Sequence, residues 1–166
     1  MNEHPKKNVI FITGMSGTGK STTLIELARR GYTVVDTDYD GFSMEVPLAG
    51  GQGFEQLWHE ERINELLSKH DEGIVFISGC VRNQSKFYPQ FDVIVLLSAP
   101  LETILERVKT RNNNPFGKTS EDRERIISDC TAVEPLLRAG ATLEINTQKP
   151  IHAVVDELEA IAKAIY

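Results

Sequence analysis

Cysteine and histidine are scarce in this sequence of 166 residues, with two and four copies respectively. Cys80 and Cys130 lie far apart in the sequence, so neither a disulfide framework nor a zinc-type cysteine spacing is indicated. The histidines are scattered, and His59 lacks the second histidine that a zinc-binding helix needs. The sequence therefore argues against a metal site built from protein ligands alone.

Long apolar runs and a surplus of positive charge are also missing. The longest apolar run, Val93–Leu97, is too short to cross a bilayer, and residues 1–8 are too polar for a signal peptide. The net charge of −6 argues against a general nucleic-acid binder and favours small phosphorylated ligands. We expect a cytoplasmic protein, monomeric or homodimeric, with neither a membrane nor a nucleic acid as partner.

Hydrophobic residues make up 40% of the sequence and charged residues 25%, which is typical of one globular domain spanning residues 1–166. Short apolar runs alternate with longer helical patterns, as in proteins with a parallel sheet covered on both faces. The predicted strands are residues 9–13, 33–36, 74–78, 92–98 and 142–145. The predicted helices are residues 20–30, 54–70, 100–111 and 119–139, and a last one that begins at Pro150.

Residues 14–21 read GMSGTGKS, a complete G-x-x-x-x-G-K-[ST] phosphate-binding loop (P-loop) after an apolar strand. Its glycines allow the backbone to approach phosphate oxygens, Lys20 is expected to reach the β- and γ-phosphates, and Ser21 to offer its hydroxyl to Mg²⁺. Thr18 and Thr22 fit either a phosphate contact or an ordinary loop and helix role. The predicted nucleotide-binding residues are Gly14, Ser16, Gly17, Thr18, Gly19, Lys20, Ser21 and Thr22.

Three aspartates follow the second predicted strand, at positions 36, 38 and 40. Ligands of parallel sheets bind at the carboxyl ends of the strands, and side chains alternate along a strand, so Asp36 and Asp38 share a face toward the P-loop. This placement suits metal binding and acid–base chemistry. The alternative is a solvated turn in which an aspartate caps the chain, and we favour it for Asp40.

The third predicted strand ends Ser78-Gly79-Cys80-Val81-Arg82, without the terminal acid of the common Walker B motif. Gly79 would allow a substrate to approach the backbone, and Arg82 would pair with an anionic group of the substrate. An ordinary surface arginine is the alternative for Arg82.

A polar stretch of turn-forming residues, 112–118, separates two predicted helices and is a candidate lid. Phosphoryl transfer requires positive charge near the transferring group, and Arg111 and Lys118 are the best-placed cations. The alternative is that both charges interact with helix ends. Residues 145–150, which join the last strand to the last helix, are positioned to border a nucleobase.

The order of these motifs resembles the shikimate kinase and nucleotide kinase group of P-loop phosphotransferases: P-loop, Asp-x-Asp, glycine after the third strand, then arginine and lid. The resemblance implies that Asp36 holds Mg²⁺ through water and that Asp38 orients or deprotonates the acceptor hydroxyl. It also implies that Arg111 lies against adenine, and that the loop with Thr147 and Pro150 completes the base pocket.

Three features depart from shikimate kinases. Trp58-His59 stands where they place an arginine for the substrate carboxylate, and Arg138 is one position away from their second such arginine. The third strand continues as Gly79-Cys80 rather than as a glycine triplet. The sequence therefore favours an acceptor other than shikimate.

Together these patterns predict a three-layer α/β P-loop NTPase fold with a five-stranded parallel sheet and a short lid. The predicted activity is transfer of the γ-phosphoryl group of ATP to a small hydroxylated or phosphorylated metabolite, with Mg²⁺ as cofactor. The alternatives are a nucleoside or nucleotide kinase, and a P-loop ATPase or regulatory nucleotide-binding module. The sequence has no N-K-x-D motif, which argues against a GTPase.

Overall fold

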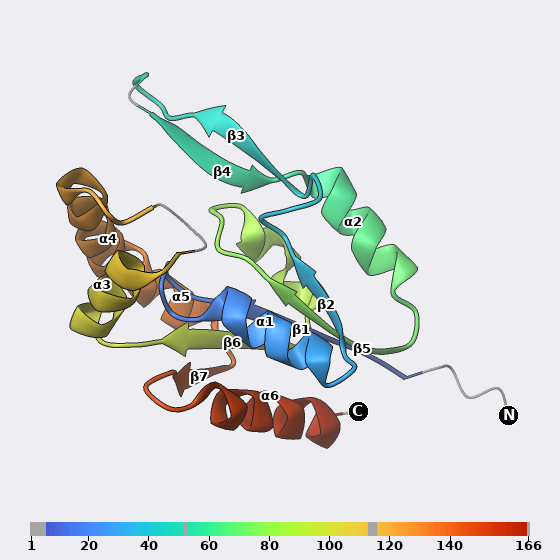
Figure 1. Cartoon of the computed structure of the whole chain (residues 1–166). Helices are drawn as coiled ribbons and strands as arrows, with labels where there is room; N and C mark the ends of the chain where they lie inside the picture. Colours follow the sequence, from blue (N-terminus) through green and yellow to red (C-terminus); the bar gives the residue numbers. More distant parts are fainter. Residues whose placement is uncertain (1–5, 52, 113–115, 166) are drawn as a thin grey trace, which may run out of the picture.

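The computed structural model describes residues 6–51, 53–112 and 116–165, which form a sheet flanked by helices (Figure 1). The elements are, in chain order, β1 (Lys7–Thr13), α1 (Lys20–Arg29), β2 (Thr33–Asp36), β3 (Ser43–Pro47), β4 (Phe54–Trp58), α2 (Glu60–Lys69), β5 (Gly73–Ser78), the 3₁₀ helix η1 (Gln84–Gln90), β6 (Val93–Ser98), α3 (Leu101–Thr110), α4 (Ser120–Ala132), α5 (Glu134–Gly140), β7 (Leu143–Asn146) and α6 (Ile151–Ile165).

The main sheet has five parallel strands in the order β2-β5-β1-β6-β7. In the centre, Ile10 of β1 pairs with Phe76 of β5 on one side and Val93 of β6 on the other. β6 is buried along its whole length, as expected for a strand covered on both faces. The predicted five-stranded parallel sheet is confirmed.

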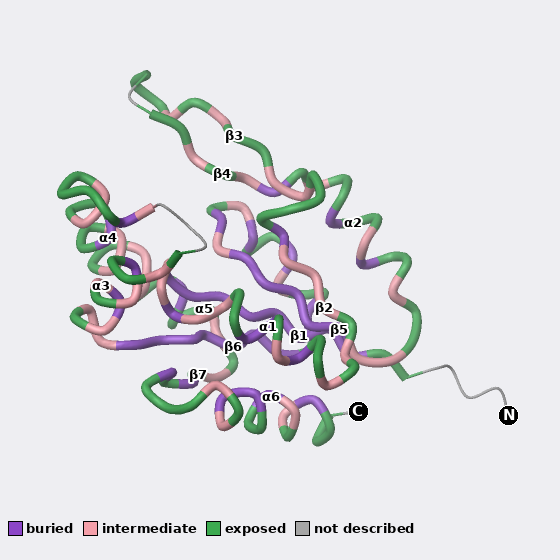
Figure 2. The backbone as a smooth tube through the Cα atoms, viewed as in Figure 1, coloured by how far each residue is buried: buried purple, intermediate pink, exposed green. Residues whose placement is uncertain are grey.

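Helices cover both faces of this sheet and form three layers (Figure 1). On one face, α1 and α6 contribute Leu27 and Leu158 to a core that contains Ile10. On the other face, α2 and η1 contribute Ile63 and Phe87 to a core that contains Phe11. Figure 2 shows burial concentrated in the sheet, while β3 and β4 are mostly exposed. The predicted α/β class is therefore confirmed.

The predicted helix over residues 54–70 is wrong in its first part, because Phe54–Trp58 is strand β4. It pairs antiparallel with β3, and beyond the paired residues the Leu48 N–H donates to the Gly53 carbonyl at 3.0 Å. Figure 1 shows this hairpin projecting from the body of the molecule. Trp58 anchors its base: the indole is fully buried, and Nε1 donates to Thr37 Oγ1 at 2.8 Å.

The predicted helix over residues 119–139 is divided at Val133 into α4 and α5. Pro135 explains the break, because it has no N–H for a helical hydrogen bond and its ring clashes with the preceding turn. The N-terminus of α4 agrees with the prediction, because the Asp122 N–H donates to the Thr119 side chain at 3.1 Å. Residues 113–115 of the candidate lid lie outside the described residues, so the lid remains a prediction.

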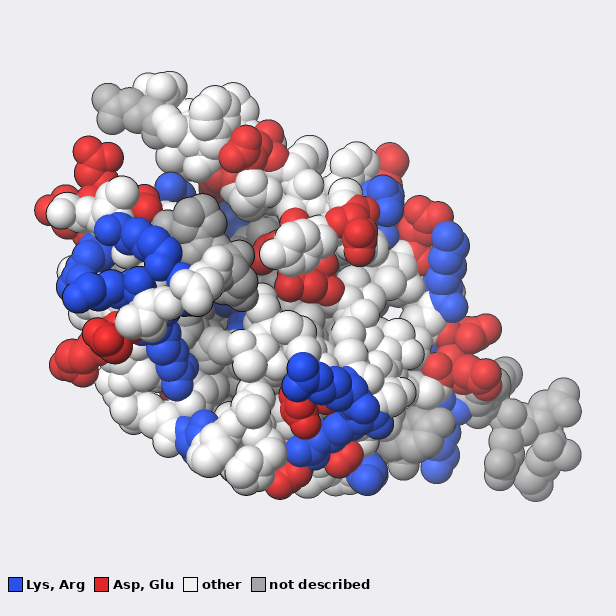
Figure 3. Space-filling model, in the orientation of Figure 1, with Lys and Arg blue, Asp and Glu red and all other residues white. Residues whose placement is uncertain are grey.

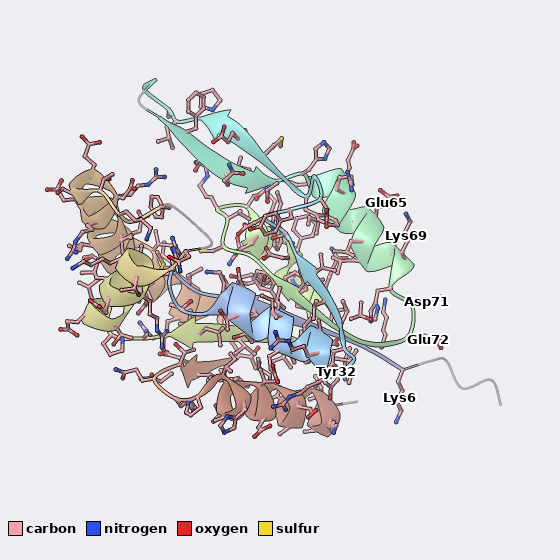
Figure 4. All side chains as sticks on the ribbon, in the orientation of Figure 1. Lys6, Tyr32, Glu65, Lys69, Asp71 and Glu72 are labelled. Carbon is pink, nitrogen blue, oxygen red and sulfur yellow. The ribbon has the colours of Figure 1, made fainter. Side chains whose placement is uncertain are left out.

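Polar contacts join the segment after α1 to α6, the two helices that cover one face of the sheet. Figure 4 labels Tyr32 at the end of α1, beside α6. Its hydroxyl donates to Glu159 at 2.8 Å, and burial together with that hydrogen bond raises the pKa of Tyr32 to about 12. Among the described residues, no helix has both the length and the apolar character needed to cross a membrane.

Candidate functional site

The loop between β1 and α1 has the backbone geometry of a phosphate cradle. Gly17 and Gly19 adopt φ values of 87° and 96°, a region that favours glycine. A Cβ on Gly17 would lie 2.8 Å from Val108 of α3, so the loop packs directly against that helix. The backbone N–H groups at the start of α1 have no helical partners and are available for an anion.

Lys20 is the first residue of α1 and turns back over the loop. Its Nζ donates to the carbonyls of Gly14 at 2.5 Å and Met15 at 3.1 Å. Burial lowers the pKa of Lys20, while the carboxylates of Asp38 and Asp36 act in the opposite direction. The ammonium is thus held at the loop, within the electrostatic reach of both aspartates.

Asp36 and Asp38 lie at the carboxyl end of β2, and their surroundings differ. Asp36 is partly buried, which raises its pKa, and its Oδ1 accepts a hydrogen bond from the Asp38 N–H at 3.0 Å. Asp38 is exposed at the rim of the site. Asp40 has a φ of 61°, and its carbonyl accepts from Arg62, which fits the turn interpretation.

A cavity of about 450 Å³ lies over the P-loop. Most of the predicted phosphate-binding residues line it, and its far walls come from the end of β2, from α3, from the β7–α6 loop and from α6. Beyond the P-loop and α1, the lining residues are Asp38, Tyr39, Arg107, Thr110, Arg111, Thr147, Lys149, Ile151 and Val154. Gly14 and Pro150 are not part of this lining.

Two arginines of α3 and its C-terminal end face this cavity. Arg107 donates to the Gly17 carbonyl at 3.3 Å, and to the hydroxyl and carbonyl of Thr147 at 2.8 Å each. Arg111 donates to Ser16 Oγ at 3.2 Å and to the Phe116 carbonyl at 2.8 Å. Burial lowers the pKa of Arg111, and its Nε has no hydrogen-bond partner among the described residues. Figure 3 shows a group of basic side chains on the left of the molecule, where Figure 1 draws α3 and α4.

The sequence did not single out Arg107, although a signal was present. Arg107 precedes Arg111 by four residues, so both lie on one face of α3. Thr18 and Thr22 both line the cavity. The Thr18 hydroxyl also donates to the Met15 carbonyl at 2.8 Å, which stabilises the loop.

A second cavity of about 220 Å³ adjoins the first. Ser16, Lys20 and Asp38 line both cavities and therefore stand between them. The other walls of the smaller cavity are Met15, Cys80, Phe116, Ile126 and Asp129. None of these five residues was predicted as a site residue, although Phe116 lies within the candidate lid.

Asp36 and three other predicted site residues also lie outside both linings. Gly79 is buried beneath Trp58, and a Cβ there would lie 3.1 Å from the indole, so its small size already has a packing reason. Arg82 pairs with Glu55 of the hairpin at 2.7 Å. Lys118 Nζ donates to the Lys109 carbonyl at 2.9 Å, which is the helix-end interaction expected as its alternative role.

Ser21, at the start of α1, and Asp36, at the end of β2, form a small oxygen-donor pair, and the Ser21 side chain partly offsets the effect of burial on the pKa of Asp36. Within the described part of the chain, no three His, Cys, Asp or Glu side chains come together as metal ligands. Mg²⁺ typically takes one or two protein oxygens together with phosphates and waters. The donor pair fits that ion.

Comparison with known proteins agrees with this geometry. A family described as an AAA domain matches residues 10–128, which is well over half of the chain. The chain belongs to this family. The predicted P-loop group, similar to shikimate kinases and nucleotide kinases, is confirmed.

Individual relatives of this AAA domain protein are distant. A shikimate kinase from Nitrosococcus oceani is 29% identical over 163 residues, covering 90% of this chain and 84% of the relative. The structure of a shikimate kinase from Acinetobacter baumannii in complex with shikimate gives a TM-score of 0.65 at 19% identity, covering 96% and 94% of the two chains. A sugar kinase from Janibacter sp. gives 0.55 at 16% identity, covering 96% of each chain. These two structures establish a shared fold.

Proposed function

We propose that this protein is a Mg²⁺-dependent kinase that transfers the γ-phosphoryl group of ATP to a hydroxyl group of a small molecule. One observation carries the proposal: the P-loop cavity and the smaller cavity share Lys20 and Asp38. A phosphate-binding lysine and a carboxylate thus stand where a donor phosphate and an acceptor would meet. The kinase names of several relatives support the same activity.

The larger cavity would hold ATP. Backbone N–H groups of the P-loop and the ammonium of Lys20 would bind the phosphates, and Arg111, beside Ser16, would offset charge in the transition state. Arg107 is a positioning residue, because it joins the P-loop to Thr147 and so fixes the wall on which the base would rest. Ser21 and Asp36 would hold Mg²⁺, which neutralises phosphate charge when bound.

Asp38 would orient the acceptor hydroxyl for in-line attack. The hydroxyl oxygen forms a bond to the γ-phosphorus as the bond from that phosphorus to the β,γ-bridging oxygen breaks. The hydroxyl proton passes to Asp38, and ADP leaves. Positioning and electrostatics would supply the rate, because the donor phosphate and the acceptor would meet beside the same two side chains.

Nucleotide-dependent stabilisation tests the donor site. A ligand present at one hundred times its dissociation constant stabilises the native state by about 2.7 kcal/mol, which corresponds to roughly 5–10 °C in Tm for a domain of this size. We expect this shift with Mg-ATP or Mg-ADP, and its loss in Lys20→Ala. Differential scanning fluorimetry measures it.

Lys69→Ala is the matched control, because Lys69 is exposed on α2, away from the P-loop (Figure 4). It should respond to nucleotide as the wild type does. An equal shift in wild type and Lys20→Ala would reject the donor site. A nucleotide shift followed only by ATP hydrolysis, with no phosphorylated acceptor, would favour the ATPase or regulatory alternative.

A further inference from the structure

The smaller cavity has a composition that selects among acceptors. Its volume of about 220 Å³ is below the range typical of drug-sized ligands, so it suits a small metabolite. Met15, Phe116 and Ile126 provide apolar walls, and Asp38 and Asp129 provide two carboxylates. Cys80 completes the lining beside the shared Ser16 and Lys20.

Among the described residues that line this cavity, the only cation is Lys20, and its Nζ is already held at the carbonyls of Gly14 and Met15 in the P-loop. The arginines that could serve a carboxylate already have partners, and Arg111, at the edge of this cavity, donates to Ser16 Oγ and to the Phe116 carbonyl. Arg82 pairs with Glu55, and Arg138 pairs with Glu144 at 2.7 Å. An anionic acceptor would therefore face two carboxylates without a cation of its own, which is unfavourable in a partly buried site.

The carboxylate of Asp129 is placed to bind a positively charged group of the ligand. It lies on α4 one turn after Ile126, so both side chains face the cavity from the same side of that helix. Its nearest basic partner, Arg125, is 3.9 Å away, beyond hydrogen-bond distance. The carboxylate of Asp129 therefore retains capacity to accept hydrogen bonds from a ligand.

We propose that the acceptor is a small alcohol that also carries a protonated amine. Its hydroxyl lies at Asp38, beside the donor phosphate, and its ammonium group lies at Asp129 between the apolar walls. The ammonium would balance the second carboxylate, and the short carbon chain or ring would contact Met15 and Ile126. This inference rests on the proposed kinase function and adds the charge class of the substrate.

Three sets of small alcohols, matched in size, test the class: amino alcohols and amino sugars, the parent polyols and sugars, and the corresponding hydroxy and uronic acids. Each set is incubated with the protein and Mg-ATP, and mass spectrometry detects products that have gained a phosphoryl group. We expect products from the amine set, with kcat/KM at least about tenfold above the neutral counterpart, equivalent to about 1.4 kcal/mol.

Products formed equally well from the neutral or acidic set would overturn the amine inference and leave the kinase proposal intact. A Mg-ATP shift in Tm without product from any set would overturn both the transfer reaction and the inference. If Mg-ATP does not shift the Tm of the wild-type protein at all, the P-loop nucleotide site itself would be rejected. The outcomes are thus distinguishable.

Asp129→Asn examines the residue directly, because it keeps the shape and removes the charge. We expect KM for the amine to rise about tenfold, the preference for amine over neutral acceptor to fall by the same factor, and KM for ATP to stay unchanged. Glu124→Gln is the control: Glu124 is exposed on the same helix and outside the cavity lining. An unchanged amine preference in Asp129→Asn would overturn the assignment.

Discussion

At the scale of single residues, the two aspartates after β2 illustrate how environment separates two identical side chains. Asp36 is drawn into the protein near Lys20 and Ser21, and burial raises its pKa. Asp38, two residues later, faces both cavities. A group whose pKa is raised by folding destabilises the native state wherever it is ionised, so the Asp36 carboxylate is costly in the free protein. We infer that the carboxylate is retained for its ligand.

Substitution to asparagine separates the roles of Asp36 and Asp38. Asp36→Asn should leave the Tm of the free protein unchanged or raise it, because no buried charge remains, and should weaken the magnesium dependence of nucleotide binding and of the transfer rate.

Asp38→Asn should keep nucleotide affinity near wild type and lower the transfer rate by roughly 10² or more, the usual range for a positioned acid–base group. Thermal unfolding, magnesium titrations and steady-state rates measure these effects.

The two variants serve as controls for one another, since each preserves side-chain shape within the same turn. Asp38→Asn with the wild-type transfer rate would remove its proposed role and restore the solvated-turn interpretation. If nucleotide binding and rate in Asp36→Asn depend on magnesium as they do in wild type, Asp36 is not a ligand of the ion.

At the scale of elements, the function depends on the P-loop resting against α3. Gly17 makes this contact possible, since its α-carbon faces Ile104 and Val108. Gly19 also has a positive φ, yet a Cβ there would meet no atom within 4 Å. The two glycines therefore serve different purposes within one motif: Gly17 gives both conformation and close packing, and Gly19 gives conformation alone.

Alanine at either glycine should reveal that difference. Both substitutions force alanine into a left-handed conformation, at a cost of about 1–2 kcal/mol. Gly17→Ala should lose about 1–3 kcal/mol more through overpacking against α3, and its nucleotide affinity should fall because Arg107 and Arg111 shift with that helix. Chemical denaturation and nucleotide titration compare the pair. If Gly17→Ala and Gly19→Ala lose the same free energy of unfolding, α3 can move away from the loop without a measurable cost.

The elements that the sequence predicted well are those whose signal is local. β1 and β6 are continuous apolar runs because both faces are covered, and the P-loop is a contiguous motif. The hairpin was missed because Phe54, Leu57 and Trp58 of β4 stand at the helical spacing i, i+3, i+4, so one helical pattern described both β4 and α2. The wall formed by Phe116 and Asp129 depends on packing between distant segments, which neither spacing nor composition encodes.

At the scale of the whole molecule, an ion pair joins a helix to the edge strand of the sheet. Arg138 of α5 bonds Glu144 of β7 at 2.7 Å, and Glu144 in turn accepts from Ser98 of β6 at 2.7 Å. The Arg138 guanidinium, followed by the Ser98 hydroxyl, holds the pKa of Glu144 below its ordinary value of 4.5. The contribution of this group to stability is complete above its unfolded pKa and is lost as the pH falls through the folded one.

Acid titration of stability should detect this link. Glu144→Gln should be less stable than wild type at about pH 7, and this difference in the free energy of unfolding should narrow as the pH falls through the lowered pKa of the wild-type carboxylate. Urea midpoints at several pH values measure it. Glu124→Gln should follow the wild-type curve throughout. If the difference in urea midpoint between Glu144→Gln and wild type is the same at every pH, the charge of Glu144 does not contribute to stability.

The division of the site between two cavities also bears on how such proteins diversify. The residues that belong to the smaller cavity alone include Asp129 of α4, a helix that packs against α3 and α5. Asp129 is only partly buried, so mutations at this position can accumulate without disturbing the P-loop. With the proposed function, a lineage built on this arrangement can therefore exchange one metabolite for another while the nucleotide site is inherited unchanged.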